Sequence, residues 1–353
     1  VNDAPVVSGI VGPLTWVEKT VLAVAPAATV FDIDSPDFDT GKLTVSVAVN
    51  ASSWDRLEVR NDGVGDGQVG VVAGVVTYGG VTVGGVTGGT SGTVPLVVTF
   101  NALATPGVVQ AVLRNVQYRS ATDNPSVLVR TLRYVLTDGD GGTSATVSQV
   151  VNVTAVNDPP VLGGIASALN YTENAVLLVA AAGTLVDVDN ANLSGGSLSV
   201  SIVTNGEVND RLAIRNQGVL AGQVGVSGAN VTFGGVVVGT WTGGDTWTNP
   251  LVISFNASAT PAIGQAIVRN VTYANTSDAP VAPLSRVLSW QATDGVGGTS
   301  AAVLQTLTIV PVNDAPVVSG IVGPLTWVEK TVLAVAPAAT VFDIDSPDFD
   351  TGK

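Results

Sequence analysis

Closely spaced carboxylates are the residues of this chain best suited to chemistry. Asp32 and Asp34 alternate along an extended segment, so both side chains can face one side of it. Asp37 and Asp39 follow shortly afterwards and add further negative charge. Because like charges repel, such crowding is relieved when a cation lies among the carboxylates. The segment therefore indicates a cation-binding site.

Two other acidic elements recur along the chain. The turn at Thr137–Gly142 carries Asp138 and Asp140 among glycines, which let backbone carbonyls turn toward one point. An Asn-Asp pair stands at three places, namely Asn2-Asp3, Asn157-Asp158 and Asn313-Asp314. The alternative interpretation is ordinary surface turns, in which Asp and Gly are common. The recurrence of all three elements favours a metal site over isolated turns.

The donor atoms indicate which metal this would be. The chain has no His, Cys or Met, so these groups offer only oxygen ligands from side chains and backbone. Such hard donors suit Ca²⁺ rather than zinc or copper, and we expect calcium as the cofactor. The same composition excludes a Ser-His or Cys-His catalytic pair. A paired-carboxylate hydrolase would need a deep cleft that a short repeated unit seldom has, so the sequence predicts no enzyme.

The segments that carry these acids are repeated. Residues 1–42 return unchanged as residues 312–353, and a weaker copy begins with VNDPPVL at Val156. The sequence therefore predicts repeat A at residues 1–155, repeat B at residues 156–311 and the start of a further repeat A at residues 312–353. We expect the chain to be part of a longer tandem array.

The composition of each repeat predicts an all-β fold. Val, Thr, Gly, Ala and Ser dominate, and stretches such as Leu43–Val49 and Leu128–Leu136 alternate apolar and polar residues, as half-buried antiparallel strands do. One short helix is expected at Thr105–Asn115, with Thr105 as its cap and Pro106 in its first position. Its counterpart in repeat B is Thr260–Asn270. The expected architecture is a Greek-key β-sandwich with one helix per repeat.

Charge and hydropathy exclude two classes of partner. The formal net charge is −14, and the 14 Lys and Arg form no basic stripe that could neutralise phosphates, so no nucleic acid is expected. The longest apolar stretch, Ala175–Val186, is far shorter than a bilayer span, so this segment is not expected to cross a membrane.

The motifs together resemble the cadherin-like tandem repeats of giant secreted bacterial adhesins and surface filaments. The elements that carry the resemblance are VNDAP, Glu18 in WVEKT, the pair Asp32-Ile-Asp34, Asp138 in TDGDGG and the following VNDPP. The resemblance implies calcium ions held at the junctions between repeats. It assigns to the first junction Glu18, Asn157, Asp158, Asp187, Asp189 and Asp294. It assigns to the following junction Glu173, Asn313, Asp314, Asp343 and Asp345.

The chain departs from the cadherin pattern in two respects. Each repeat has a long Gly/Val-rich middle, at Gly70–Gly92 and Gly225–Gly244, which predicts additional strands. The cadherin Asp-Arg-Glu motif has no counterpart in the expected place, because Asp55-Arg56-Leu57-Glu58 comes too early. One or two ions per junction are therefore expected rather than three.

Trp241 and Trp247, in the segment GTWTGGDTWTNP, have no aromatic counterpart in repeat A. They could form an exposed platform for a sugar ring or a neighbouring chain. The other interpretation is that they cover the local core of an inserted hairpin, and it is the favoured one.

These features predict an extracellular, calcium-stiffened repeat segment with a mechanical role in a surface filament or adhesin stalk. Its partners would be neighbouring repeats of the same array, with self-assembly into fibres, either along one chain or by exchange of strands between subunits. The alternative from another class is a carbohydrate- or partner-binding adhesin module that uses the Trp241/Trp247 loop.

Overall fold

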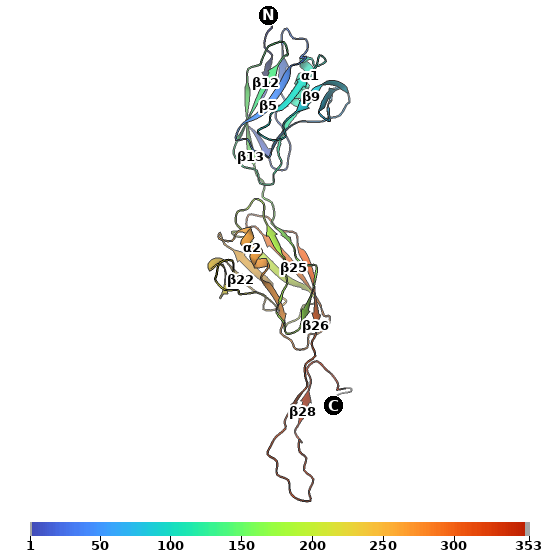
Figure 1. The fold of residues 1–353 in the computed structure, drawn as a ribbon, viewed down its shortest axis with the longest axis vertical. Coiled ribbons are helices and arrows are strands. Elements are labelled where there is room, and N and C mark those ends of the chain that lie inside the picture. Colours follow the sequence, from blue (N-terminus) through green and yellow to red (C-terminus); the bar gives the residue numbers. More distant parts are fainter. Residues whose placement is uncertain (1, 350–353) are drawn as a thin grey trace. The chain divides into compact units, whose positions relative to one another are not determined.

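The computed structural model describes residues 2–349, and nearly all of its regular structure is β-strand, with two short helices in the described part of the chain. The chain divides into two compact units, Val1–Val156 and Asn157–Lys353. Figure 1 shows the elements of both units. Repeat A lies in the first unit. Repeat B and the C-terminal segment, residues 312–353, lie in the second.

Repeat A contains thirteen strands and one helix. They are β1 (Val6–Ser8), β2 (Leu14–Val17), β3 (Leu22–Ala23), β4 (Thr29–Phe31), β5 (Lys42–Val49), β6 (Asp55–Val59), β7 (Val69–Val72), β8 (Val75–Tyr78), β9 (Val81–Thr87), β10 (Leu96–Phe100), α1 (Pro106–Arg114), β11 (Val116–Ser120), β12 (Arg130–Thr137) and β13 (Val147–Thr154).

The second unit repeats this order and then continues into the C-terminal segment. Its elements are β14 (Val161–Gly163), β15 (Ala168–Thr172), β16 (Leu177–Leu178), β17 (Thr184–Val186), β18 (Ser197–Thr204), β19 (Asp210–Ile214), β20 (Val224–Ser227), β21 (Asn230–Phe233), β22 (Val236–Thr242), β23 (Leu251–Phe255), α2 (Pro261–Val268), β24 (Val271–Asn275), β25 (Ser285–Thr293), β26 (Val303–Val310), β27 (Val317–Ser319) and β28 (Thr340–Phe342).

Each repeat is a sandwich of one large and one small sheet. In repeat A the strand orders are β2-β13-β12-β5-β10-β9-β8-β7 and β3-β11-β6, and the same orders recur in repeat B. The two sheets meet through buried aromatic side chains. The rings of Trp16 and Tyr118 pack edge to face with centroids 5.8 Å apart, and those of Tyr171 and Tyr273 do so at 4.9 Å. These are Ig-like β-sandwich repeats, the predicted fold class.

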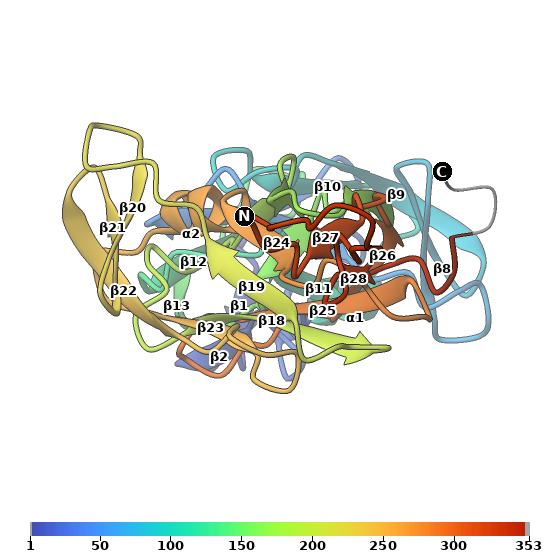
Figure 2. The same cartoon turned by 90° about the horizontal axis from the view of Figure 1, so that it is seen from below.

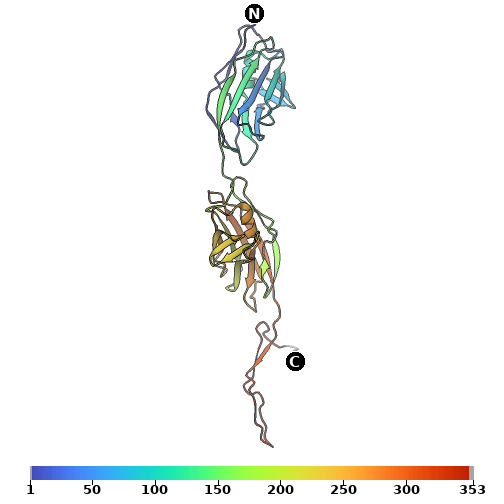
Figure 3. The ribbon, with the colours of Figure 1, turned by 60° about the vertical axis from the view of Figure 1, so that its left-hand side comes forward.

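The alternating sequence of the long strands places one face in the core. In β5, Leu43, Val45 and Val47 are buried, while the residues between them are half-buried. Strand β12 pairs with β5 along most of its length, and Figure 3 shows the two side by side in blue and green. The period of two in the sequence is therefore the period of the core.

The Gly/Val-rich middle of each repeat forms the predicted additional strands. They are β7–β9 in repeat A and β20–β22 in repeat B, which extend the large sheet beyond β10 and β23. Figure 2 shows β20–β22, in yellow, at one edge of the sheet next to β23. Close approach of neighbouring strands explains one of the glycines, because a Cβ on Gly239 would lie 2.2 Å from the carbonyl oxygen of Ser254.

The helices lie where the sequence predicts them, with one correction at the cap. Thr260 accepts a hydrogen bond from the backbone N–H of Ile263, but the Thr105 side chain makes no capping bond. Both residues have extended backbones, with φ −73° and ψ 162° at Thr260 and φ −66° and ψ 162° at Thr105. The difference therefore lies in the orientation of an exposed hydroxyl group. In the described part of the chain, no helix combines the length and the hydrophobicity needed to span a bilayer.

Candidate metal site

Three carboxylates converge at the end of repeat B where the chain continues into the C-terminal segment. Glu173 directly follows β15, Asp278 lies in the loop after β24, and Asp314 lies beyond the end of β26. One carboxylate oxygen from each lies within 4.8 Å of the others. Strands β15 and β26 are parallel and pair up to Thr172 and Val310, so their C-terminal ends lie next to each other. We call these residues the acidic triad of repeat B.

Glu173 is the buried member of the triad. Its side chain is only 4 % exposed, and its Oε2 accepts a hydrogen bond of 2.8 Å from the backbone N–H of Val312. The other oxygen, Oε1, is buried and has no hydrogen-bond partner. A buried carboxylate oxygen without a partner costs free energy, and a bound cation would remove that cost.

Asp314 connects the triad to the first acidic pair of the C-terminal segment. Its backbone N–H donates to Oδ2 of Asp345 over 3.1 Å. Oδ2 of Asp314 and Oδ1 of Asp345 are buried without partners. Desolvation, followed by the charges of Asp278, Asp345 and Asp343, raises the pKa of Asp314 above its ordinary value. The site thus gathers several hard oxygen donors under mutual repulsion, which fits Ca²⁺.

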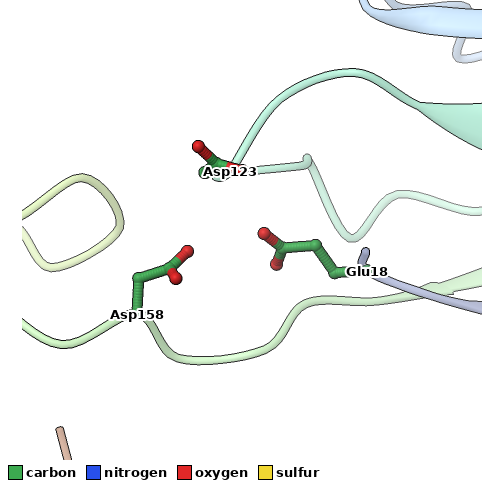
Figure 4. Close-up of side chains that lie close together, drawn as sticks. All are labelled: Glu18, Asp123 and Asp158. Atoms are coloured by element: carbon green, nitrogen blue, oxygen red, sulfur yellow. The ribbon is translucent and has the colours of Figure 1, made fainter. Parts of the chain in front are cut away.

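Repeat A has the same arrangement at the matching positions. The Glu18 side chain is 3 % exposed, its Oε2 accepts a hydrogen bond of 2.8 Å from the N–H of Val156, and its Oε1 has no partner. Asp123 follows β11 as Asp278 follows β24. Figure 4 draws Glu18 and Asp123 together with Asp158, which corresponds to Asp314 in the sequence.

Sequence reasoning missed Asp123 and Asp278. The available signal was the recurrence of an Asp two residues before a Pro at matching places in the two repeats, in TDNP and SDAP. Both lie in loops far along the chain from Glu18 and Glu173, so only the folded structure brings them to those residues.

A buried polar network supports the loop that carries Asp278. Arg286 is 1 % exposed and forms ion pairs with Asp210 at 2.8 Å and with Glu207 at 2.9 Å. The Asn275 side chain donates to Asp210 over 2.7 Å and to Glu207 over 3.2 Å. The oxygen of the same amide accepts the backbone N–H of Ser277 at 2.8 Å. The network therefore fixes the backbone next to Asp278.

Repeat A retains only the centre of this network. Arg130 pairs with Asp55 at 3.0 Å, both fully buried, so Asp55 serves the core rather than a cadherin-type ligand motif. Ser52 and Ser120 replace Glu207 and Asn275, and the Ser120 hydroxyl is buried without a partner. The loop of Asp123 consequently lacks the support that the loop of Asp278 has.

Other predicted residues meet at the opposite end of each sandwich, where the turn after β12 or β25 lies. The side chain of Asn2 donates to Asp138 at 2.9 Å, and that of Asn157 donates to Asp294 at 2.7 Å. The backbone N–H of Asp3 likewise donates to Asp34 at 2.9 Å. The Asn-Asp pair, the Asp-x-Asp pair and the Asp-Gly turn are thus joined within one repeat.

Two of these acids act as structural turn residues. Asp294 is fully buried and accepts the backbone N–H groups of Val296, Gly297 and Gly298. Burial alone would raise the pKa of Asp294, but the hydrogen bonds from Asn157 and from this backbone outweigh it and lower the pKa. Asp138 has the same surroundings and a lowered pKa. Their oxygens are already occupied by hydrogen bonds.

The Asp-x-Asp pairs keep unoccupied oxygens. Oδ2 of Asp32 and Oδ2 of Asp187 are buried without hydrogen-bond partners. Burial, the largest influence, raises the pKa of Asp187. The backbone N–H of Asp158 donates to Asp189 at 3.0 Å, as the equivalent pairs do in the other copies.

The remaining predicted residues lie outside these groups of contacts. Asp39 and Asp140 are exposed, and Asp37 accepts the backbone N–H of Asp39 at 3.0 Å. The exposed Asn313 bonds to the backbone oxygen of Asp314.

The two tryptophans differ in exposure. Trp241 is half-buried against the core of repeat B, and its Nε1–H donates to the Gly228 carbonyl at 3.0 Å. Trp247 is 38 % exposed, and its ring lies so close to Gly206 that a Cβ there would be 2.5 Å away. The geometry of Trp241 agrees with a residue that covers the hairpin.

No family model and no curated protein sequence matches the chain. Solved structures to which it is similar include Drosophila N-cadherin EC1-4, at 12% identity and TM-score 0.18 over 90% of this chain and 53% of that one. The collagen adhesin of S. aureus gives 12% identity and TM-score 0.21, with coverage of 88% and 93%. An endo-fucoidan hydrolase of glycoside hydrolase family 107 gives 10% and 0.21, with coverage of 87%. The chain spans 29% of that hydrolase.

Proposed function

We propose that this chain is a structural repeat segment of an extracellular filament or adhesin stalk, in which calcium stiffens the connection from one repeat to the next. The observation that carries the proposal is the acidic triad of repeat B. Two of its carboxylates, Glu173 and Asp278, belong to the repeat itself. The third, Asp314, belongs to the start of the following copy of repeat A.

Calcium would act here as a crosslink. An ion held by oxygens from both sides would restrict the linker around Val312, whose N–H already bonds to Glu173. It would also occupy the unpartnered Oε1 of Glu173 and offset the desolvation and the repulsion that together raise the pKa of Asp314. By sequence correspondence, Glu18, Asp123 and Asp158 would serve the first junction in the same way. Extracellular calcium modules work near about 10⁻⁴ to 10⁻³ M, and we expect an affinity in this range.

The repetition of the sequence supports the proposed mechanical role. A segment of 42 residues returns unchanged, so any junction chemistry in this chain recurs wherever the repeat does. Neighbouring repeats are therefore the proposed partners, and assembly into fibres would use the same ends.

Small-angle scattering of the whole chain, first with calcium and then with excess EGTA, tests this function. The calcium concentration is about 2 mM, roughly twofold above the upper end of the range for such sites. We expect the maximum dimension and the flexibility of the chain to change on chelation, while the far-ultraviolet circular dichroism stays constant because the cores are apolar. Magnesium at the same concentration is the control for ionic strength. Identical scattering profiles with and without calcium would contradict the proposal.

A further inference from the structure

Repeat B carries a polar groove that has no part in the acidic sites. It has a volume of about 500 Å³ and lies between α2 and the segment that follows β19. Its polar lining consists of Arg215, Gln217, Gln265, Arg269 and Asn270. Figure 1 shows α2, in orange, on repeat B. A volume of this size is in the range of small-molecule sites.

Both arginines are held by the fold through one nitrogen only. Nε of Arg215 donates to Oδ1 of Asn270 over 2.9 Å, and Nε of Arg269 donates to the carbonyl of Gly183 over 2.7 Å. The terminal nitrogens of both guanidinium groups form no ion pair with any carboxylate of residues 2–349. The groove therefore presents fixed positive charge with unused donors.

Repeat A shows that this positive charge is specific to repeat B. Nε of Arg60 makes the equivalent bond to Oδ1 of Asn115, at 3.1 Å. However, Arg60 also forms an ion pair of 2.6 Å with Asp62. The residue that matches Asp62 in repeat B is Gln217, so the acid that neutralises this arginine is missing there.

Positive charge is rare in repeat B, and two of its arginines line this one groove. Residues 157–311 contain no Lys, and their four Arg are Arg211, Arg215, Arg269 and Arg286. Arg286 is ion-paired in the buried network, and Arg211 donates to the backbone oxygens of Val208 and Asp210. The two arginines that remain line the same groove, in a chain whose net charge is −14.

We propose that this groove binds a carboxylate-bearing ligand of the size of one sugar-acid residue. Guanidinium groups match the planar carboxylate with paired N–H donors. The amides of Gln217, Gln265 and Asn270 can donate to or accept from hydroxyl groups. A ligand with a single negative charge fits better than a phosphate dianion, which the acidic surface of the protein repels more strongly.

The experiment removes calcium from the whole chain with EDTA, dialyses the EDTA away, and then titrates sodium glucuronate at low ionic strength. Isothermal calorimetry and amide chemical shifts follow the binding. Glucose and inorganic phosphate are the matched ligands without a carboxylate. We expect glucuronate to bind with a Kd of about 1 mM and to shift the amides around Arg215 and Arg269. Because calcium is removed before the titration, the result is independent of the proposed calcium function.

Two substitutions locate the binding. Gln217→Asp restores the acid of repeat A, and Arg269→Gln removes one cation, and each should weaken glucuronate binding about tenfold or more. The reciprocal Asp62→Gln should free Arg60 and create a second, weaker site in repeat A. Failure of glucuronate to bind, binding that both repeat B substitutions leave unchanged, or equal binding of glucose or phosphate would each overturn the assignment.

Discussion

The substitution Glu173→Gln probes the acidic triad with two effects of opposite sign. Glutamine has nearly the same shape, and its Oε1 can still accept the N–H of Val312. It removes the charge of a side chain that is only 4 % exposed and has one oxygen without a partner. The amide Nε2 that takes the place of this oxygen can donate to the nearby carboxylates of Asp278 and Asp314. Without calcium we therefore expect the variant to be more stable than the native chain. A purely structural role for Glu173 predicts no such gain.

The magnitudes follow from the burial of the site. Satisfying one buried polar group, here by an amide that donates where the carboxylate oxygen could not, contributes about 1–3 kcal/mol, and the lower value raises the melting temperature of repeat B by about 2–4 °C in EGTA. A site with a Kd of about 10⁻⁴ M contributes about 1.4 kcal/mol at 1 mM calcium. The native chain should gain this stabilisation and the variant should gain little of it. The difference between the melting temperatures of the variant and the native chain should therefore become smaller or change sign when calcium is added.

Differential scanning calorimetry in EGTA and in calcium measures the stability, and calorimetric titration counts the calcium bound. The chain contains its own control, because Glu329 is the corresponding residue of the C-terminal segment and its side chain is 79 % exposed. Glu329→Gln should change neither quantity. If Glu173→Gln lowers the melting temperature in EGTA, or binds as much calcium as the native chain, the inference from the unpartnered oxygen is wrong.

Three further results are expected. Asn275→Ser introduces the residue of repeat A and should weaken calcium binding at the triad about threefold to tenfold, because the loop of Asp278 loses hydrogen bonds that hold it in place. Calcium titration measures the affinity, with the Asp278→Asn variant as the comparison. Arg286→Met leaves the buried Asp210 and the partly buried Glu207 without their ion pair and should destabilise repeat B by about 3–5 kcal/mol, with the calorimetric transition of repeat A unchanged. Because the pKa of Asp314 is raised, protons compete with calcium at higher pH than at an ordinary Asp, so affinity should fall as the pH drops through that raised pKa; a calcium affinity that stays constant down to the ordinary Asp pKa would contradict it.

Much of the architecture is predictable from the sequence because it depends on local patterns. Alternation of apolar residues places β5 and β12, the Gly/Val-rich middle predicts β7–β9 and β20–β22, and Pro106 marks the start of α1. The internal repeat predicts that both units share one fold. The alternation, the Gly/Val-rich segments and Pro106 each lie within or beside the element that they predict.

The pairing of acids across the chain is a matter of tertiary structure. The sequence singled out Glu173 and Asp314, and their mutual approach follows from the parallel pairing of β15 with β26, which no local pattern reveals. Asp278 joins them although its strand, β24, belongs to the small sheet, where it pairs with β16 and β19, and its neighbours in the sequence are those of an ordinary turn. Asp138 and Asp294 show the converse, since an acidic turn typical of a metal site has its oxygens occupied by hydrogen bonds once the chain is folded.

The buried network shows most clearly what the fold alone decides. Asp55 and Asp210 look like surface acids in the sequence, yet each pairs in the core with an arginine 75 or 76 residues further along. A charge is tolerated in the interior only when its partner arrives with it, and that partner is chosen by strand pairing rather than by sequence distance. Composition and repetition therefore determined that this protein is an acidic tandem β-sandwich, whereas the folded chain determined which carboxylates are neutralised internally and which remain available for a cation.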